Sequence, residues 1–411
     1  MKDGLRLYFY LAFCLVIAIC GYFTTSIPLI VVLFGVVMYS TYFLKFVEPI
    51  YLYIGVSILM SMGSSMFFLL LTLPLYLNKN SYSVMGSITK SPVVFVIVVL
   101  SFLSFCTGIQ ASFTTMLVFF MGIWLYIMTS NISINDDEFY IYVVFSFLVV
   151  ALTLYIQLLR GEIVILYNRL AFDDNIRKLA DVIAIPAFVS FSYLIMGKGS
   201  ISYKILYCVV GVLSAAILMM TLSKGALISA IVGLLVVLIK STIRRGGGKS
   251  VLYFLILGIF SYWAFCFVSN MDDTFGVSRL SEEDDGFSGR TYIWDLYYVK
   301  LMESPVHAIL GFGPGELQRL NYSEFYAHSA FLDIFFSYGI SMSVIMCLVL
   351  IKIFRYVYRS KDTFAMAFLV FSCLLFTTHG LCTNHQLYIL VAISVALAKH
   401  SNNDTISDNC E

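Results

Sequence analysis

Long apolar runs, separated by short polar or charged stretches, follow one another along the chain to about residue 400. A membrane-spanning helix needs about 20 such residues, while the alternating pattern of a membrane β-barrel strand is absent. The pattern therefore predicts an all-α fold, a polytopic transmembrane helical bundle of about 12 spans. The candidate spans are residues 6–24, 27–46, 49–77, 93–110, 112–129, 138–158, 180–197, 203–221, 225–241, 251–268, 331–354, 364–381 and 385–399.

Composition excludes a soluble globule. Hydrophobic residues make up 60% of the 411 residues and charged residues only 12%, which leaves too little polar surface to cover a protein of this size. The net charge of +1 excludes no partner, because in a membrane protein the position of the charges matters more than their sum. The nine cysteines show no metal-ligand spacing and are interpreted as apolar packing residues, so no metal is expected.

Basic residues orient the bundle. They crowd the short loops at 240–249 and 352–361, which marks both loops as cytoplasmic. By alternation, the loop 159–179, the turn 222–225 and the long segment 269–330 lie on the outer face. The orientation of the N-terminus stays open, because the early runs and the first basic residues disagree. The predicted segments are 1–158 (N-terminal transmembrane helices), 159–268 (central transmembrane helices with external basic loops), 269–330 (external loop), 331–400 (C-terminal transmembrane helices) and 401–411 (cytoplasmic tail).

The segment 269–330 is the long polar part of the chain, and loops of that length in compact proteins are usually functional or disordered. Its aromatic content argues for order, and Thr291–Leu301 has the apolar spacing of a short helix lying on the membrane surface. The acidic run Glu282–Asp285 lacks the spacing of a calcium loop and is interpreted as a solvated face. Gly311–Gly315 predicts a tight turn whose backbone N–H groups, that of Gly313 included, approach a phosphate or a sugar.

Several basic residues stand on the predicted outer face, against the usual preference for the cytoplasmic side. They are Arg169, Arg177, Lys224 and Arg290. An anion at the membrane boundary explains them, and a lipid pyrophosphate fits because arginine pairs with phosphate oxygens through two hydrogen bonds. Structural alternatives stay open: Arg177 can pair with aspartates between residues 173 and 181, Arg169 can extend to the interface from apolar surroundings, and Lys224 can belong to a helix-start turn.

His328 is the candidate general base, because it stands where the long outer segment enters a span and a neutral imidazole accepts protons near neutral pH. His307, beside a proline, and His379 and His385, at the last hairpin, are interpreted as structural residues.

Four short segments, in order around the one outer loop, resemble the O-antigen polymerase and ligase superfamily of bacterial inner-membrane proteins. They are 222–226 (LSKGA), 288–294 (SGRTYIW), 310–315 (LGFGPG) and 327–332 (AHSAFL), with Tyr338-Gly339-Ile340 following. The resemblance covers roughly residues 160–345. This chain has Lys224 where the family usually has arginine in a Ser-Arg-Gly turn, and Ser329 where asparagine often follows the histidine. A lysine keeps the charge but loses the two-pronged geometry.

The resemblance implies transfer of a glycan from undecaprenyl pyrophosphate, at the periplasmic face of the inner membrane, without a nucleotide sugar, cofactor or metal. His328 and Arg290 would be catalytic, and Arg169, Lys224, Arg177 and Gly313 would bind the pyrophosphate or glycan. The expected partners are the lipid-linked glycan, the bilayer and a chain-length regulator protein, and no nucleic acid. We expect a polymerase that extends a lipid-linked repeat unit. The alternatives are a ligase that transfers the finished glycan to lipid A-core, and a flippase or transporter for the same lipids.

Overall fold

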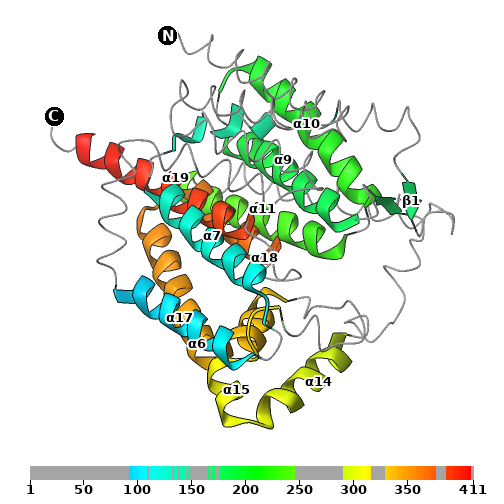
Figure 1. Cartoon of the computed structure of the whole chain (residues 1–411). Coiled ribbons are helices and arrows are strands. Elements are labelled where there is room, and N and C mark those ends of the chain that lie inside the picture. Colours follow the sequence, from blue (N-terminus) through cyan, green and yellow to red (C-terminus); the bar gives the residue numbers. More distant parts are fainter. Residues whose placement is uncertain are drawn as a thin grey trace, which may run out of the picture. The chain divides into compact units, whose positions relative to one another are not determined.

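The computed structural model describes residues 92–108, 111–131, part of 134–151, 164–166, 169–171, 176–197, 199–221, 223–245, 290–315, 329–375 and 386–408. They divide into two compact units. Unit 1 holds the described residues between 134 and 282, and unit 2 holds those between 76 and 133 and between 283 and 411. Apart from one two-stranded hairpin, this described part of the chain is helical (Figure 1), which confirms the predicted helical fold.

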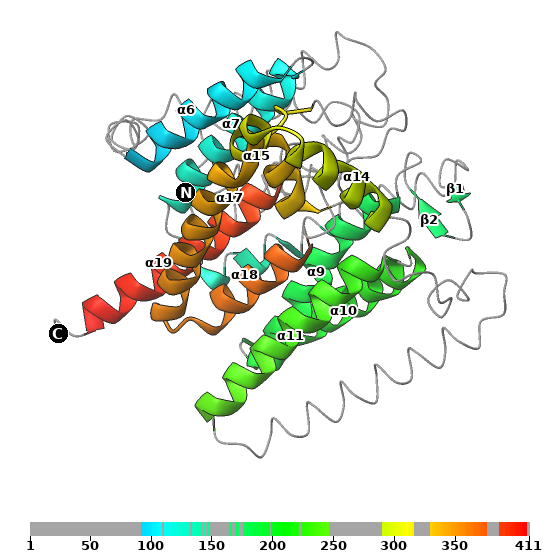
Figure 2. The same ribbon diagram turned by 90° about the horizontal axis from the view of Figure 1, so that it is seen from below.

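Three consecutive helices form most of unit 1. They are α9 (Ile176–Met196), α10 (Ile201–Met220) and α11 (Lys224–Arg245). Each packs against the other two, and short turns make neighbours antiparallel (Figure 2). The first turn contains Gly197 and Gly199, both at positive φ, which ends α9 as glycine commonly does. Gly211 lets α10 approach α9 closely, because an added Cβ would lie 3.3 Å from Ser190 and Phe191.

Three buried tyrosines of unit 1 pack against one another near the α9–α10 turn. The rings of Tyr193 and Tyr207 stack with centroids 3.9 Å apart, and Tyr140 meets Tyr193 edge-on at 5.1 Å. The Tyr140 hydroxyl contacts the Met196 sulfur at 3.9 Å. Aromatic pairs prefer these stacked and edge-on arrangements, so the cluster fixes how α9 and α10 pack at this end.

Unit 1 also holds the short hairpin of β1 (Val164–Leu166) and β2 (Arg169–Ala171). The strands are antiparallel, with Leu166 paired to Arg169, and β2 packs against α9 and α10. The sequence pattern predicted a loop here and no strands.

The described part of unit 2 contains five apolar helices and a short helical hairpin. The helices α7 and α19 pack together, α18 packs against α19, and α17 lies against α6, α18 and α19. The bounds are α6 (Pro92–Thr107), α7 (Phe113–Ser130), α14 (Arg290–Met302), α15 (Pro305–Leu310), α17 (Ala330–Arg359), α18 (Thr363–Leu375) and α19 (Gln386–Asp408).

Polar groups fix the ends of several helices in unit 2. The Asp362 carboxylate accepts the N–H groups of Phe364 and Ala365 at 2.8 and 3.1 Å, which caps the start of α18. The Lys399 ammonium donates to the Asn131 carbonyl at 2.7 Å, so a cation meets the negative end of α7.

Within the described residues, four helical segments are long and apolar enough to cross a membrane. They are Leu179–Met196, Ile201–Met220, Gly225–Ile243 and Ala330–Arg359. Large apolar side chains such as Ile205, Val209 and Leu348 are exposed on them, as expected of a membrane protein whose helices face lipid. The predicted spans before residue 92 and at 251–268 lie outside the described residues, and the count of about 12 stays a prediction. The predicted domain boundaries also stay predictions.

Candidate functional site

The helix α17 is interrupted at Gly339, whose φ of 73° and ψ of −175° are not helical. An α-helix satisfies each carbonyl with the N–H four residues further on, so the interruption removes the partners of the carbonyls just before it. In hydrocarbon each unsatisfied backbone group costs several kcal/mol. A membrane helix broken at this point therefore needs hydrogen-bond donors from another segment.

The turn after α15 supplies these donors. The N–H of Phe312 donates to the Phe336 carbonyl and the N–H of Gly313 to the Ser337 carbonyl, both at 2.9 Å. In the opposite direction, the Ser341 hydroxyl donates to the Ile309 carbonyl at 2.7 Å. The segment 309–313 is thus hydrogen-bonded to α17 on both sides of the interruption.

Residues at the end of α6 and directly before α7 also form hydrogen bonds with this turn and with α17. The Ser104 hydroxyl donates to the Ser337 carbonyl at 2.6 Å, which gives that carbonyl a second donor. The Thr107 hydroxyl lies 3.4 Å from the Gly311 carbonyl, and the Ser112 N–H donates to the Pro314 carbonyl at 2.7 Å. Backbone and hydroxyl groups of α6, α7 and α17 therefore fix the turn in one position.

Glycine is required on both sides of this contact. A Cβ on Gly311 would overlap the Ser337 carbonyl and lie 2.5 Å from the Tyr338 nitrogen. A Cβ on Gly339 would overlap the Ile309 carbonyl and lie 2.6 Å from the Gly311 nitrogen. Both residues also have positive φ, 80° and 73°, which side chains disfavour. The two glycines let the turn and the broken helix meet backbone to backbone.

Gly313 is buried in this contact, with φ of 93°, and an added Cβ would lie 2.9 Å from the Ala111 Cβ. The predicted tight turn is therefore present, with three glycines at positive φ between residues 311 and 315. The Gly313 N–H, however, is already donated to the Ser337 carbonyl. Substrate binding at Gly313 stays a prediction, and any contact with substrate needs a group other than this N–H.

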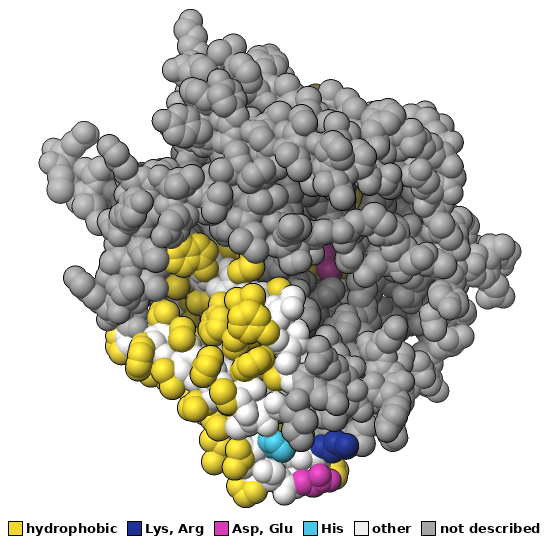
Figure 3. Space-filling model, viewed as in Figure 1, with side chains coloured by type: hydrophobic (Ala, Val, Ile, Leu, Met, Phe, Trp, Pro, Cys, Tyr) yellow, Lys and Arg dark blue, Asp and Glu magenta, His cyan; other side chains and the backbone are white. Residues whose placement is uncertain are grey.

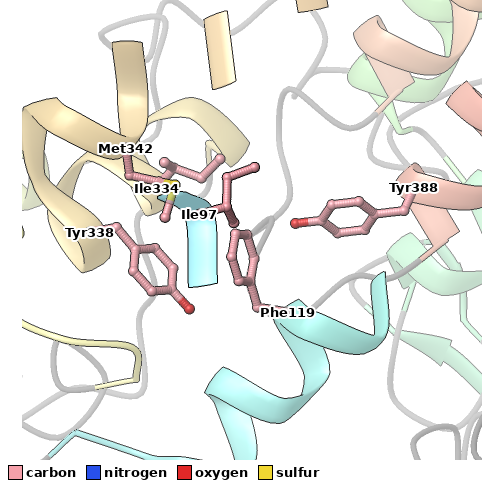
Figure 4. Close-up of a cluster of buried hydrophobic side chains, with 6 residues drawn as sticks. All are labelled: Ile97, Phe119, Ile334, Tyr338, Met342 and Tyr388. Atoms are coloured by element: carbon pink, nitrogen blue, oxygen red, sulfur yellow. The ribbon is translucent and has the colours of Figure 1, made fainter. Parts of the chain in front are cut away.

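Apolar side chains pack behind the interruption (Figure 4). Tyr338, directly before Gly339, lies with its ring centroid 4.7 Å from that of Phe119 on α7. The buried cluster comprises Ile97, Phe119, Ile334, Tyr338, Met342 and Tyr388. It brings together α6, α7, α17 and α19, so the broken helix is supported by packing as well as by hydrogen bonds.

A second buried cluster ties the α14–α15 hairpin to α17. It comprises Tyr297, Leu301, Phe312 and Phe336, and the rings of Tyr297 and Phe336 meet edge-on at 5.3 Å. The His307 ring lies 4.7 Å from that of Phe312. This contact agrees with the structural role expected for His307, and the hairpin is held against the half of α17 that precedes Gly339.

Of the two predicted catalytic residues, the structure describes only the backbone of Arg290. Arg290 is the first residue of α14, which confirms the predicted short helix, but its side chain lies outside the described residues. His328 also lies outside them. Ser329 is the N-cap of α17, with extended backbone, so the span begins where the sequence predicted. Asp333, in the first turn of α17, is only 8% exposed, and buried ionisable groups in membrane helices are often functional.

The other predicted basic residues belong to unit 1. Arg169 lies in β2, Arg177 in the first turn of α9, and Lys224 is the first residue of α11. Because α9, α10 and α11 alternate in direction and β2 ends shortly before α9, the backbone places all three positions toward one end of the unit (Figure 2). Their side chains are not among those described.

Sequence reasoning assigned no role to Gly339, Ser104 or Thr107. A glycine inside the apolar run 331–354 was the available signal for a break, since an isolated glycine in a helical pattern often has a packing reason. The two hydroxyls gave no signal, because serine and threonine usually bond within their own membrane helix. Within the described ranges, no three His, Cys, Asp or Glu side chains are grouped as metal ligands.

Residues 209–347 match the family model described as O-antigen ligase. The match runs from within α10 to within α17 and includes the glycine turn, His328 and the interruption at Gly339. No curated protein matches the sequence. The match at 209–347 supports the resemblance to the superfamily of O-antigen polymerases and ligases that the motifs predict.

Proposed function

We propose that the protein is an O-antigen or related surface-polysaccharide polymerase. It transfers a glycan from undecaprenyl pyrophosphate to the terminal sugar hydroxyl of a lipid-linked repeat unit, at the outer face of the inner membrane. The observation that carries the proposal is that two motif segments, 310–315 and 327–332, are both joined to one helix. The glycine turn bonds to α17 at Phe336 and Ser337, and the histidine segment leads into the cap of the same helix at Ser329.

The proposed reaction is a single displacement at the anomeric carbon. The acceptor oxygen forms a bond to that carbon as the bond to the pyrophosphate oxygen breaks, and the electron pair leaves with the pyrophosphate. His328 takes the proton of the acceptor hydroxyl. Arg290 stabilises the negative charge that grows on the leaving pyrophosphate. The other basic residues predicted to bind it, Arg169, Arg177 and Lys224, belong to unit 1, and their part stays a prediction.

The broken helix contributes a rigid frame to this mechanism. Reacting groups must be held close to their productive geometry, and misplacement by about 1 Å can cost a hundredfold in rate. The paired carbonyls of Phe336 and Ser337 and the packing of Tyr297 on Phe336 fix α14 and the glycine turn against α17. Arg290 is the first residue of α14, and His328 directly precedes Ser329, the cap of α17, in the sequence.

Two other functions each have an observation in their favour. The matching family model is described as O-antigen ligase, which favours transfer of the finished glycan to lipid A-core. The interruption of α17 favours a flippase or transporter, because transporters commonly use discontinuous helices at their substrate sites. Here, however, the carbonyls at the interruption are paired with donors of the same chain, which suits a fixed frame better than a moving gate.

The test in cells compares two basic residues of α14. Arg290→Ala should abolish lengthening of the surface glycan at normal protein abundance, because the leaving group loses its cation. Lys300→Ala, on the same helix, is the matched control and should leave the glycan ladder unchanged. A normal ladder in the Arg290→Ala strain would contradict the proposed role of Arg290 in transfer.

A further inference from the structure

The α14–α15 hairpin carries an exposed face of large apolar side chains, which we name the apolar face. The residues of the apolar face are Tyr298, Val299, Met302, Val306 and Ile309, each between 49% and 58% exposed. They follow helical spacing on α14 and continue on α15. Proteins in water rarely leave such contiguous patches open, so a cover of some kind is expected.

The apolar face continues onto surfaces of the membrane helices. Ile309 lies level with the interruption of α17, because its carbonyl abuts Gly339 and accepts the Ser341 hydroxyl. On α17, the adjoining Ile340 and Val344 are about as exposed as Ile309. In Figure 3, hydrophobic side chains follow one another over this side of unit 2, with basic, acidic and histidine side chains at its lower end.

The other neighbour of α15 extends the same surface. The hairpin packs against α6, whose Phe102 and Leu103 are also exposed. These two residues directly precede Ser104, which is hydrogen-bonded to α17 at Ser337. Exposed apolar side chains of α6, α15 and α17 therefore lie around one level, that of the interruption.

The depth of this level follows from the basic residues at the far end of α17. Lys352 and Arg359 lie about 20 Å and about 30 Å from Gly339 along the axis, at a rise of about 1.5 Å per residue. Such residues mark a membrane boundary, and the hydrocarbon core is about 30 Å thick. The leaflet on the side away from Lys352 and Arg359 therefore contains the interruption and Ile309 beside it, or has them at its boundary.

We propose that the apolar face of α14–α15 is embedded in the acyl region of that leaflet. The described hairpin at 290–310 is then inserted in the membrane and does not lie in water. Asp295, exposed one turn before Tyr298 on α14, marks where the helix rises toward the headgroups. Glu303, exposed in the turn between α14 and α15, extends from the edge of the face to the headgroups in this placement. The inference goes beyond the proposed function, since it holds for any reaction. It places the start of α14 at the level where the phosphates of a lipid-linked substrate lie.

The experiment measures the surroundings of single positions in the full-length protein in phospholipid liposomes. A genetically encoded fluorescent amino acid replaces Ile309 in one variant and Val306 in another, so that misfolding of either variant leaves a second reading. Val344 on α17 provides the lipid-facing control and Asp295 the water-facing control. The quenchers are phospholipids with a nitroxide on the acyl chain and, separately, iodide in the buffer.

At Ile309 and Val306 we expect the nitroxide lipid to quench the probe as strongly as at Val344, while iodide has no effect. The probe at Asp295 should show the reverse. Quenching of both hairpin positions by iodide alone would overturn the proposal by placing the face in water. Insensitivity to both quenchers would also overturn it, because the cover would then be protein, either another part of the chain or a second copy.

Discussion

The backbone contact between Gly339 and Gly311 makes Gly339→Ala the sharpest test of the site's architecture. With φ of 73° and ψ of −175°, Gly339 lies in a region that is nearly exclusive to glycine, and another residue there costs about 1–3 kcal/mol. The added Cβ would also overlap the Ile309 carbonyl. If the turn moves away, the Phe336 carbonyl loses its donor, at about 1–3 kcal/mol for a group left unsatisfied, while the Ser337 carbonyl keeps the Ser104 hydroxyl.

These terms sum to a loss on the order of 5 kcal/mol, a large part of the 5–15 kcal/mol that typically stabilises a folded protein. The alternative open to the variant is to straighten α17, since alanine favours helix, and thereby to expel the glycine turn. Either outcome should lower the unfolding temperature of the purified protein by about 6 °C and abolish glycan transfer.

The assay is thermal unfolding in detergent, together with glycan lengthening in cells. Gly211→Ala is the matched control, because Gly211 also lies in a membrane helix but an added Cβ stays 3.3 Å from its nearest neighbours. That variant should unfold within about 1–2 °C of the wild type. A Gly339→Ala protein with wild-type stability and activity would refute the claim that the interruption is structurally required.

The remaining predictions concern Ser104, whose hydroxyl donates to the Ser337 carbonyl, and His328, the proposed base. Ser104→Ala removes a donor to the Ser337 carbonyl and should lower the free energy of unfolding by about 1 kcal/mol in a thermal unfolding assay. The control is Ser101→Ala, which should be close to neutral because the Ser101 hydroxyl bonds within α6. Equal effects of the two substitutions would contradict a special role of Ser104. His328→Ala should lower the transfer rate on the order of a hundredfold while the lipid-linked donor still binds, and His307→Ala should be milder. Normal turnover in the His328→Ala protein would exclude that histidine as the base.

Much of the helical framework was predictable from the sequence because apolar runs bounded by polar residues leave few alternatives in a membrane. The runs 203–221 and 112–129 agree with α10 and α7 to within two residues. The run 331–354 ended too early, because α17 continues to Arg359. The predicted run ended where basic residues become frequent and hydropathy falls. The helix itself continues into water as long as its backbone hydrogen bonds persist.

The interruption of α17 was not predicted from the sequence, and the reason is physical. The apolar pattern runs through Gly339 unchanged, and the partners that make the break stable lie far away in the chain, at Phe312 and Ser104. The turn at 311–315 was predictable from its glycines. The sequence did not show, however, that the Gly313 N–H donates to α17 and not to a ligand. The strands β1 and β2 are too short to leave a readable alternation.

The most direct test of the account is glycan transfer by the purified protein in liposomes. The liposomes contain the repeat unit linked to undecaprenyl pyrophosphate, and lipid A-core is offered as a competing acceptor. The account predicts longer lipid-linked glycans, with one undecaprenyl pyrophosphate released for each bond formed and no requirement for a nucleotide sugar. Glycan attached to lipid A-core would instead establish a ligase. Movement of the glycan between leaflets without new bonds would contradict the claim that this protein catalyses glycosyl transfer.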